Sequence, residues 1–194
     1  YIFKDSKMTM PNTPTPPIKG VKITWQKIHE DDRGQFTTAF LTEPVAPVEV
    51  MSVISQVNFI KTKRNVLRGA HVSLKPQHKA FMVLKGTVRQ RLVDCRKGSP
   101  TYGKCWDVDH KVVDGYRMVV HVPPFVASAI ISYTKATLVY ATDTLYDPDV
   151  ELSVNLYTQD KTFDILETFT VSEKDKNGVS VTTAGDKIDE YNHC

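Results

Sequence analysis

The feature that most limits the fold is a succession of short apolar or alternating segments from Val21 onward, with no long helical stretch between them before residue 160. They are enriched in Val, Ile, Tyr and Thr, and turn-forming Gly, Pro, Asp and Lys-Gly sequences separate them. Examples are VKITWQKI, VMSVISQVNFI, AFMVLKGTVRQRLVD, YRMVVHVPPFVASAII and ATLVYATDTLY. Many short strands without intervening helices predict an all-β fold, an antiparallel sandwich or a jelly-roll barrel.

The two ends of the chain differ in composition from this strand-rich middle. Residues 1–20 contain MTMPNTPTPPIKG, whose Pro and Thr content predicts a flexible lead-in. Residues 21–178 form one predicted domain, since 194 residues with 41% hydrophobic side chains suit a single core. Residues 179–194 are polar and charged, and we expect most of this tail to be mobile. Inside the domain, AFMVLKG and TVRQRLVDC predict a hairpin that turns at Lys85 and Gly86.

Charge and hydropathy argue against several classes of function. Lys and Arg total 25 against 22 Asp and Glu, an excess too small and too scattered for a nucleic-acid surface. A local basic pocket for a phosphorylated small molecule stays compatible with this balance. No apolar run reaches the roughly 18–20 residues that span a bilayer, and the N-terminus lacks a secretory pattern. Cys95, Cys105 and Cys194 have no metal-ligand or redox spacing, which favours reduced thiols in a cytoplasmic protein.

The histidines do not show the spacing of a metal site. Ser73 stands two positions after His71, where a second ligand on the same strand face would be needed, and His78 follows Pro76 in a predicted loop. We therefore expect no metal ion. Without one, His71 is a candidate general base, because imidazole suits proton transfer at neutral pH. A core histidine bonded to a carbonyl is the alternative.

Three further residues are candidates for proton chemistry. Lys79 opens the strand KAFMVLKG, where an inward-facing amine could stabilise a developing enolate oxygen; a solvent-facing lysine is the alternative. Tyr140 in ATLVYATD stands near a strand end and is either an acid or a core aromatic. Asp175 stands among charged residues in VSEKDKNG, and from composition alone we expect it to be exposed to solvent in a charged surface segment.

Two arginines beside glycines are candidate anion ligands. Arg33 in DDRGQF precedes a glycine at a predicted strand start, and a surface salt bridge with its aspartate neighbours is the alternative. Arg68 also precedes a glycine, and it stands in an apolar run three residues before His71, which surface pairing explains less well. Together these candidates indicate proton abstraction next to a carbonyl on an anionic substrate.

Seven motifs occur in a recognisable order along residues 21–178: DDRGQF, SQVNF, NVLRGAH, HKAFMVLKGTV, VDCRKGSPTYGKCW, VYATDTLYDP and VSEKDKNG. In this order they resemble the dTDP-4-dehydrorhamnose 3,5-epimerases, and LRG-x-H followed by DxRxGSPTxG is a specific pair. The resemblance implies a cupin-type jelly roll with short peripheral helices, a homodimer, no metal and no cofactor. It implies inversion of C3 and C5 of a nucleotide-linked 4-keto-6-deoxyhexose, on the route to nucleotide-linked L-rhamnose.

The resemblance also implies roles for single residues. His71 matches the family's base and Asp175 its partner, which replaces the solvated interpretation of Asp175. Lys79 matches the lysine that would bear the charge on the 4-oxygen, and Tyr140 matches the acid on the opposite face. Six positions match those that line the nucleotide-sugar pocket: Arg33, Phe36, Gln56, Asn58, Arg68 and Ser128.

Some of these matches carry qualifications. The segment of Arg33 and Phe36 can reach the neighbouring subunit in the family. Ser128, in PPFVASAI, replaces a pocket histidine, and Thr38 replaces a glutamate. The sequence leaves open dTDP or UDP, and one or two epimerised centres. A non-catalytic sugar-nucleotide-binding cupin and a metal-dependent cupin enzyme are the alternatives from other classes.

Overall fold

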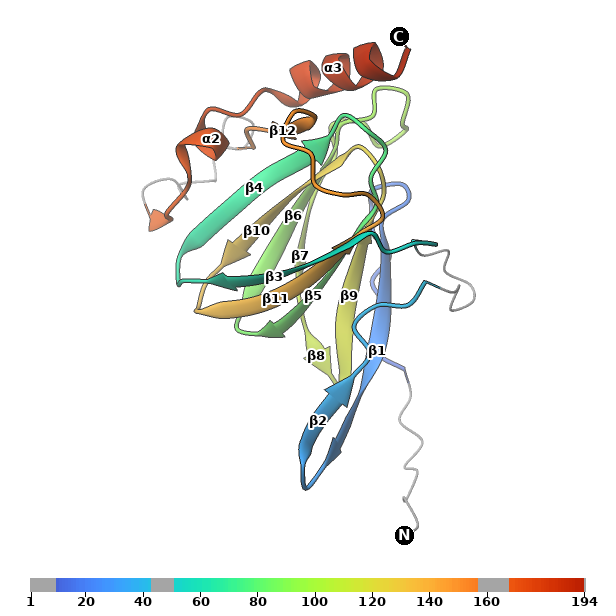
Figure 1. Cartoon of the computed structure of the whole chain (residues 1–194), viewed down its shortest axis with the longest axis vertical. Helices are drawn as coiled ribbons and strands as arrows, with labels where there is room; N and C mark the ends of the chain where they lie inside the picture. The colour runs from blue at the N-terminus through green and yellow to red at the C-terminus, as the bar shows by residue number, and fades with distance from the viewer. Residues whose placement is uncertain (1–9, 43–50, 157–167, 194) are drawn as a thin grey trace.

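Two antiparallel β-sheets face each other across the main core in the computed structural model, which describes residues 10–42, 51–156 and 168–193 (Figure 1). The seven-stranded sheet has the order β2-β1-β9-β5-β11-β3, with β8 paired to β9, and the five-stranded sheet has the order β12-β4-β10-β6-β7. The strands are β1 (Lys22–Asp31), β2 (Gly34–Thr37), β3 (Gln56–Thr62), β4 (Val66–Ser73), β5 (Lys79–Lys85), β6 (Val88–Asp94), β7 (Cys105–Asp109), β8 (Val112–Val113), β9 (Tyr116–Val122), β10 (Val126–Ser132), β11 (Ala136–Thr142) and β12 (Glu151–Ser153). The predicted all-β architecture is confirmed.

The strands bury side chains on both faces of the seven-stranded sheet. Along β5, Phe81 and Val83 point into the main core between the sheets, while Met82 points to the other face. That outer face is covered by side chains from the segments flanking residues 43–50, among them Phe40 and Ile54. Continuous apolar runs such as AFMVL follow from this double coverage, because a strand buried on both faces shows no polar alternation.

The expected hairpin at Lys85 and Gly86 is wrong. β5 pairs with β9 and β11, whereas β6 pairs with β7 and β10, so the chain crosses from one sheet to the other at this turn. Gly86 has a φ of 95°, and a Cβ there would lie 2.5 Å from the carbonyl oxygen of Lys135. The turn residues were therefore identified correctly, but two apolar strands joined by a tight turn need not be hydrogen-bonded to each other.

The end of the chain also differs from expectation. The tail expected to be mobile forms a helix, α3 (Val181–His193), which packs against the outer face of the five-stranded sheet (Figure 1). Val181, Ala184 and Ile188 are buried there, at the spacing of one helical face. Three small or medium apolar residues in a polar segment were enough to dock it.

Part of the lead-in is also packed. Ile18 is 1% exposed and belongs to the main core, and Thr13 accepts a hydrogen bond from the Trp25 indole at 3.0 Å. Residues 10–20 are therefore anchored over at least part of their length. The first nine residues lie outside the described part of the chain, and the domain boundaries stay a prediction.

Candidate active site

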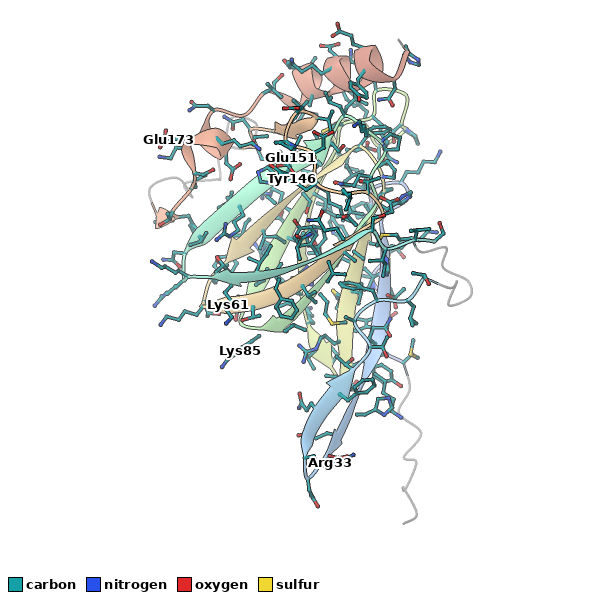
Figure 2. All side chains as sticks on the ribbon, in the orientation of Figure 1. Arg33, Lys61, Lys85, Tyr146, Glu151 and Glu173 are labelled. Carbon is teal, nitrogen blue, oxygen red and sulfur yellow. The ribbon has the colours of Figure 1, made fainter. Side chains whose placement is uncertain are left out.

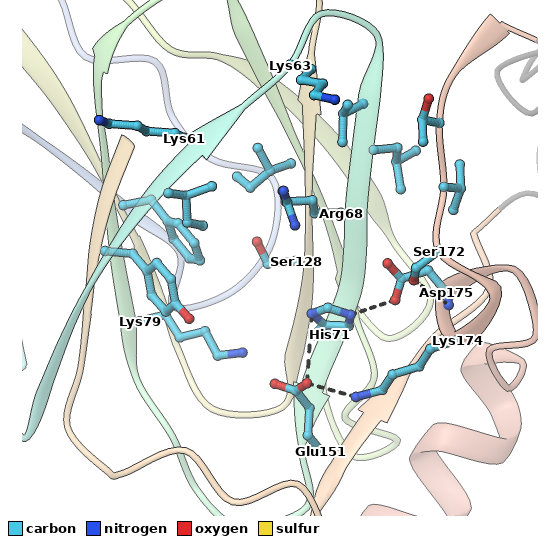
Figure 3. A pocket seen from close by; sticks show the side chains of 18 of the residues that line it. Lys61, Lys63, Arg68, His71, Lys79, Ser128, Glu151, Ser172, Lys174 and Asp175 are labelled. Carbon is cyan, nitrogen blue, oxygen red and sulfur yellow. Dashed lines mark hydrogen bonds and ion pairs between the residues drawn. The ribbon is translucent and has the colours of Figure 1, made fainter. Parts of the chain in front are cut away.

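A cavity of about 670 Å³ opens between the two sheets, next to the short helix α2 (Glu173–Lys176). Its walls come from β4 and β10 of one sheet and β3, β5 and β11 of the other. Figure 3 shows Arg68 and Ser128 above His71 in this cavity, with Glu151 below the imidazole, Lys79 at the lower left and Asp175 to the right of the imidazole. Segments distant in sequence thus supply its polar groups.

His71 and Asp175 form the closest ionisable pair in the cavity. The imidazole Nε2 lies 2.7 Å from Asp175 Oδ1, and the other ring nitrogen, Nδ1, lies 4.0 Å from Glu151 Oε1 (Figure 3). An ionised carboxylate can only accept hydrogen bonds, so Nε2 carries the ring proton and donates a hydrogen bond to Asp175. Nδ1 is left with a lone pair, which makes it the nitrogen able to act as a base.

Asp175 is held from several sides. Its Oδ2 accepts from the Gly69 amide at 3.1 Å, its Oδ1 accepts from the Ser153 hydroxyl at 3.1 Å, and its own amide bonds the N-cap Ser172. Burial alone would raise the pKa of Asp175, but the hydrogen bonds from His71 and Gly69 outweigh it and lower the pKa to about 2. The group is therefore an anion at neutral pH, in a fixed orientation.

Gly69 is required at its position for two reasons. Its φ is 104°, in the region that side-chain-bearing residues avoid, and an added Cβ would lie 2.6 Å from the Ser128 carbonyl oxygen. This conformation delivers the Gly69 amide to Asp175. The glycine of the LRG-x-H motif thus serves the His71–Asp175 pair directly.

Lys79 presents a buried amine to the cavity. Its Nζ forms no hydrogen bond or ion pair with any residue that the structure describes, and the side chain lines the cavity at the start of β5. Burial lowers the pKa of the ammonium, and the nearby Glu151 carboxylate opposes that shift. A buried amine without a hydrogen-bond or ion-pair partner among the described residues is available to donate to a negative charge that develops on a bound molecule.

Tyr140 lies on β11, in the sheet opposite to the strand that carries His71. Its ring stacks on Phe81 at a centroid distance of 5.1 Å. Burial, followed by the charge of Glu151, raises the pKa of the phenol, so the hydroxyl keeps its proton at neutral pH. The cavity therefore has an imidazole nitrogen able to accept a proton on one wall and a phenol able to donate one on the other.

Comparison with known proteins identifies the family. The model of the family described as dTDP-4-dehydrorhamnose 3,5-epimerase matches residues 15–183. The chain belongs to this family. The predicted family is thereby confirmed.

Individual members of the epimerase family resemble this chain over most of its length. A dTDP-4-dehydrorhamnose 3,5-epimerase from Methanothermobacter thermautotrophicus is 29% identical over 82% of this chain and 89% of its own. A dTDP-4-dehydro-6-deoxyglucose 3-epimerase from a Streptomyces species is 32% identical over 86% and 87%. The crystal structure of a 3,5-epimerase from Legionella pneumophila, in complex with dTDP-4-keto-L-rhamnose, has a TM-score of 0.77 at 26% identity, covering 91% of this chain and 96% of that one. The expected cupin-type jelly roll is confirmed by this likeness.

The site residues predicted for this epimerase-family chain fall into two groups. The structure brings six of them into one cavity: Arg68, His71, Lys79, Ser128, Tyr140 and Asp175. Gln56 and Asn58 border it, since Gln56 Nε2 donates to Asn58 Oδ1 at 2.8 Å and Gln56 Oε1 accepts from the amide of the cavity residue Tyr146. These two lie beside the cavity, on strand β3 next to Tyr140.

Arg33 and Phe36 do not reach the cavity of their own chain. Arg33 occupies the turn between β1 and β2, far from Tyr146 and Glu151 (Figure 2), and pairs with Asp31 as the salt-bridge alternative anticipated. The Phe36 side chain is 67% exposed on β2. Thr38, one of the departures, is exposed and does not line the cavity either.

Several cavity residues were missed by the sequence interpretation. Glu151 and Lys174 form an ion pair at 3.1 Å beside His71, and Tyr146, Lys61 and Lys63 also line the walls. The sequence around Glu151 and around Lys174 predicts ordinary charged side chains on the protein surface. The sequence offered one signal for each: Lys174 directly precedes Asp175, and Glu151 follows the Tyr-Asp-Pro sequence closely.

Metal and membrane features are not observed in the described residues. Among them, no three His, Cys, Asp or Glu side chains are grouped so as to hold a metal ion. None of their helices is both long and apolar enough to cross a membrane.

Proposed function

We propose that this chain epimerises C3 and C5 of a dTDP-linked 4-keto-6-deoxyhexose by taking a proton from one face and returning a proton to the other. The observation that carries this proposal is the placement of His71 and Tyr140 on opposite sheets, with the buried amine of Lys79 in the same cavity. Base and acid on opposite faces of a ring produce inversion. If the base and the acid lay on the same face of the ring, the proton would only be exchanged and the configuration of the carbon would be retained.

The chemistry follows from these three groups. The 4-keto group acidifies the hydrogens on the neighbouring carbons, and His71 Nδ1 takes one of them while Asp175 stabilises the imidazolium. The electron pair of the broken C–H bond moves to the 4-oxygen as an enolate, whose charge Lys79 balances. Tyr140 then gives its phenolic proton to the carbon from the opposite face. The imidazolium and the phenolate return to their starting states by proton exchange with solvent.

Cationic side chains at the other end of the cavity support a nucleotide diphosphate as the carrier. Arg68, Lys61 and Lys63 line that end, away from Glu151 and Lys79 (Figure 3). The Arg68 side chain forms no hydrogen bond or ion pair with other described residues, so its guanidinium is available for a phosphate. The relatives named above act on dTDP-sugars according to their names, which favours dTDP over UDP.

Proton NMR of dTDP-4-keto-6-deoxyglucose in deuterated buffer tests the proposal. Deuterium is expected at both C3 and C5 with the wild-type protein, and at neither carbon with His71→Asn, while dTDP binding is retained. The 3-epimerase among the relatives favours a second candidate, inversion at C3 alone, and deuterium at C3 only would establish it. Full turnover by His71→Asn contradicts the mechanism. Sugar-nucleotide binding by the wild type without any exchange identifies a non-catalytic binding protein.

A homodimer in which Arg33 and Phe36 complete the partner's cavity belongs to the same proposal. The hairpin of β1 and β2 extends away from the body of the chain (Figure 1), the Arg33 side chain is 90% exposed, and Phe59 on the edge strand β3 is 70% exposed. Val57, two positions earlier on β3, is 52% exposed as well, and an exposed apolar edge of this kind supports a surface that another protein covers.

Subunit mixing tests the shared site. Arg33→Ala and His71→Asn are each expected to be inactive or weak, and a mixture exchanged into heterodimers should recover about a quarter of wild-type activity, because half of the dimers then hold one intact site of two. No recovery, with heterodimers verified, overturns the shared site. A cytoplasmic location is also proposed, and it is supported by the free, buried thiol of Cys95.

A further inference from the structure

Ser128 occupies a distinctive place in the cavity. It lies on β10 directly opposite His71 in the strand pairing, and Figure 3 shows its hydroxyl between Arg68 and the imidazole. The Ser128 Oγ is 2.8 Å from Nε2 of Gln90, on the neighbouring strand β6. A residue this close to the base is placed to contact the reacting part of a bound sugar.

A buried chain of hydrogen bonds continues behind Ser128. Gln90 is fully buried, and its Oε1 lies 2.9 Å from Nε2 of His110. Burial lowers the pKa of His110 to about 4, with the Asp109 charge opposing this, so the ring is neutral at pH 7. The other ring nitrogen, His110 Nδ1, is buried without a hydrogen-bond partner among the described residues.

The position of the imidazole proton decides the direction of the whole chain. A neutral ring carries one N–H, and a proton on His110 Nδ1 would be a buried donor without an acceptor. A proton on Nε2 leaves only an unused lone pair at Nδ1, which is the less costly arrangement. His110 Nε2 therefore donates to Gln90 Oε1, which turns the amide nitrogen of Gln90 toward Ser128.

The Ser128 hydroxyl consequently accepts within the protein and keeps its own proton unused. A hydroxyl has one proton and two lone pairs, and Gln90 occupies one of those lone pairs. No acceptor for the Ser128 proton is present among the described residues. The cavity is the direction in which that proton can be donated.

We propose that Ser128 donates a hydrogen bond to a sugar oxygen of the bound nucleotide-hexose, close to the carbon from which His71 takes a proton, and that Gln90 and His110 are the positioning residues that hold it in this donor state. This inference rests on the proposed function. It assigns to Ser128 a donor role specific for the sugar rather than for the nucleotide.

Binding of an unreactive substrate relative tests the donor role. dTDP-glucose lacks the keto group, so it binds without turnover, and dTDP alone reports the nucleotide half. Ser128→Ala is expected to weaken dTDP-glucose binding about three- to tenfold, the size of one neutral hydrogen bond, and to leave dTDP binding unchanged. Ser128→Cys, of nearly equal shape but with a weak donor, should behave like Ser128→Ala. Wild-type affinity for dTDP-glucose in both variants overturns the inference.

Gln90→Glu tests the direction of the buried chain. A carboxylate at position 90 can only accept, so it would take the Ser128 proton and remove the donor from the cavity. The loss of dTDP-glucose affinity should match that of Ser128→Ala, and the double variant should lose no more than either single variant. If Gln90→Glu does not fold, Gln90→Leu is used in its place. Gln90→Leu removes the hydrogen bond to Ser128 but leaves the Ser128 hydroxyl in the cavity, so the loss of dTDP-glucose affinity should be smaller. Added to Ser128→Ala, Gln90→Leu should cause no further loss.

The outcomes separate this inference from the proposed function. A wild-type protein that binds neither dTDP nor dTDP-glucose contradicts the proposed function itself. A wild-type protein that binds both, with additive losses from Gln90→Glu and Ser128→Ala, contradicts only the donor chain.

Discussion

His71 and Asp175 lie 104 positions apart in the chain, and the imidazole Nε2 is 2.7 Å from the carboxylate Oδ1. β4 supplies the histidine, and the four-residue helix α2 supplies the aspartate. This contact selects the tautomer, because a proton held on Nε2 leaves Nδ1 free to face Glu151 and the cavity. The basic nitrogen of the site is thus defined by a residue on another element.

Replacing the Tyr140 hydroxyl separates proton exchange from inversion. Tyr140→Phe keeps the ring on Phe81 but removes the proton donor, so His71 can still exchange the substrate hydrogen with solvent on its own face. Inversion is expected to fall by about 10²–10⁴-fold, while deuterium entry without inversion continues. Proton NMR in deuterated buffer measures both. Tyr133→Phe, whose ring packs on Phe169 outside the cavity, is the control, and full inversion by Tyr140→Phe would remove it from the mechanism.

Removing the Ser153 hydroxyl is expected to change the pH dependence of catalysis. Ser153 donates to the same Asp175 oxygen that accepts from His71, so Ser153→Ala leaves more negative charge beside the imidazole. The acid limb of the kcat/KM profile should move to higher pH by about half a unit, while kcat on the plateau changes little. A drop of equal size at every pH would indicate a merely structural role.

Other charges around the imidazole stay in place in this experiment. The titratable or charged side chains that line the cavity with His71 are Lys61, Lys63, Arg68, Lys79, Tyr140, Tyr146, Glu151, Lys174 and Asp175. Ser153→Ala removes none of them. Asp175→Asn, which removes the carboxylate itself, should shift the acid limb in the opposite direction and lower kcat as well.

The residues of the motif DxRxGSPTxG are expected to stabilise the fold rather than to take part in catalysis. The buried Asp94 carboxylate accepts from Arg96, Ser99 and Thr101 at 2.7, 2.7 and 2.6 Å, outside the cavity. Asp94→Asn leaves the guanidinium without its counter-charge and should lower the free energy of unfolding by about 2–3 kcal/mol in urea titrations. The activity of the folded fraction should stay unchanged.

A second Arg–Asp pair supplies the control for that experiment. Asp109 bonds Arg89 in a similar geometry, but both side chains are substantially exposed. Asp109→Asn is expected to cost less than about 1 kcal/mol of unfolding free energy. Equal losses for the two variants would show that burial of Asp94 is not the cause.

The free energy of unfolding should fall as the pH is lowered, already at pH values where the carboxylates are still ionised. Burial lowers the pKa of His110 and of His121 to about 4, below the ordinary histidine value of 6.5. Between pH 6.5 and pH 4 the unfolded chain therefore binds more protons than the folded one, and the free energy of unfolding falls as the pH falls. Each histidine contributes a slope of up to about 1.4 kcal/mol per pH unit. Urea unfolding at pH 7, 6 and 5 measures it.

A single substitution identifies the source of that slope. His121→Gln keeps a polar group near Thr24 Oγ1 but does not titrate, so about half of the slope should disappear. The lowered pKa values of Asp94 and Asp175 act at lower pH, since their stabilisation is lost only below the ordinary aspartate value of 3.8. A slope unchanged by His121→Gln would exclude His121 as a contributor.

Local patterns were sufficient to predict the strand class and much of the cavity. Short segments rich in β-branched residues and separated by turns indicate an all-β fold, because propensity and turn chemistry act over a few neighbouring residues. Arg68 and His71, three positions apart in one strand, could be recognised in the same way. The assignment of Asp175 needed a family resemblance, since composition alone indicated a solvated charge.

What the sequence by itself determined is therefore the strand-rich class of the fold and the identity of the family. Only the tertiary structure decided which strand pairs with which, as the crossing at Gly86 illustrates, and which charges meet in the cavity, as with Glu151 and Lys174. It also decided that the polar C-terminal segment docks as α3. The physical reason is common to all three. Strand partners, buried ion pairs and helix docking depend on free energies gained between segments distant in sequence, and no local pattern contains them.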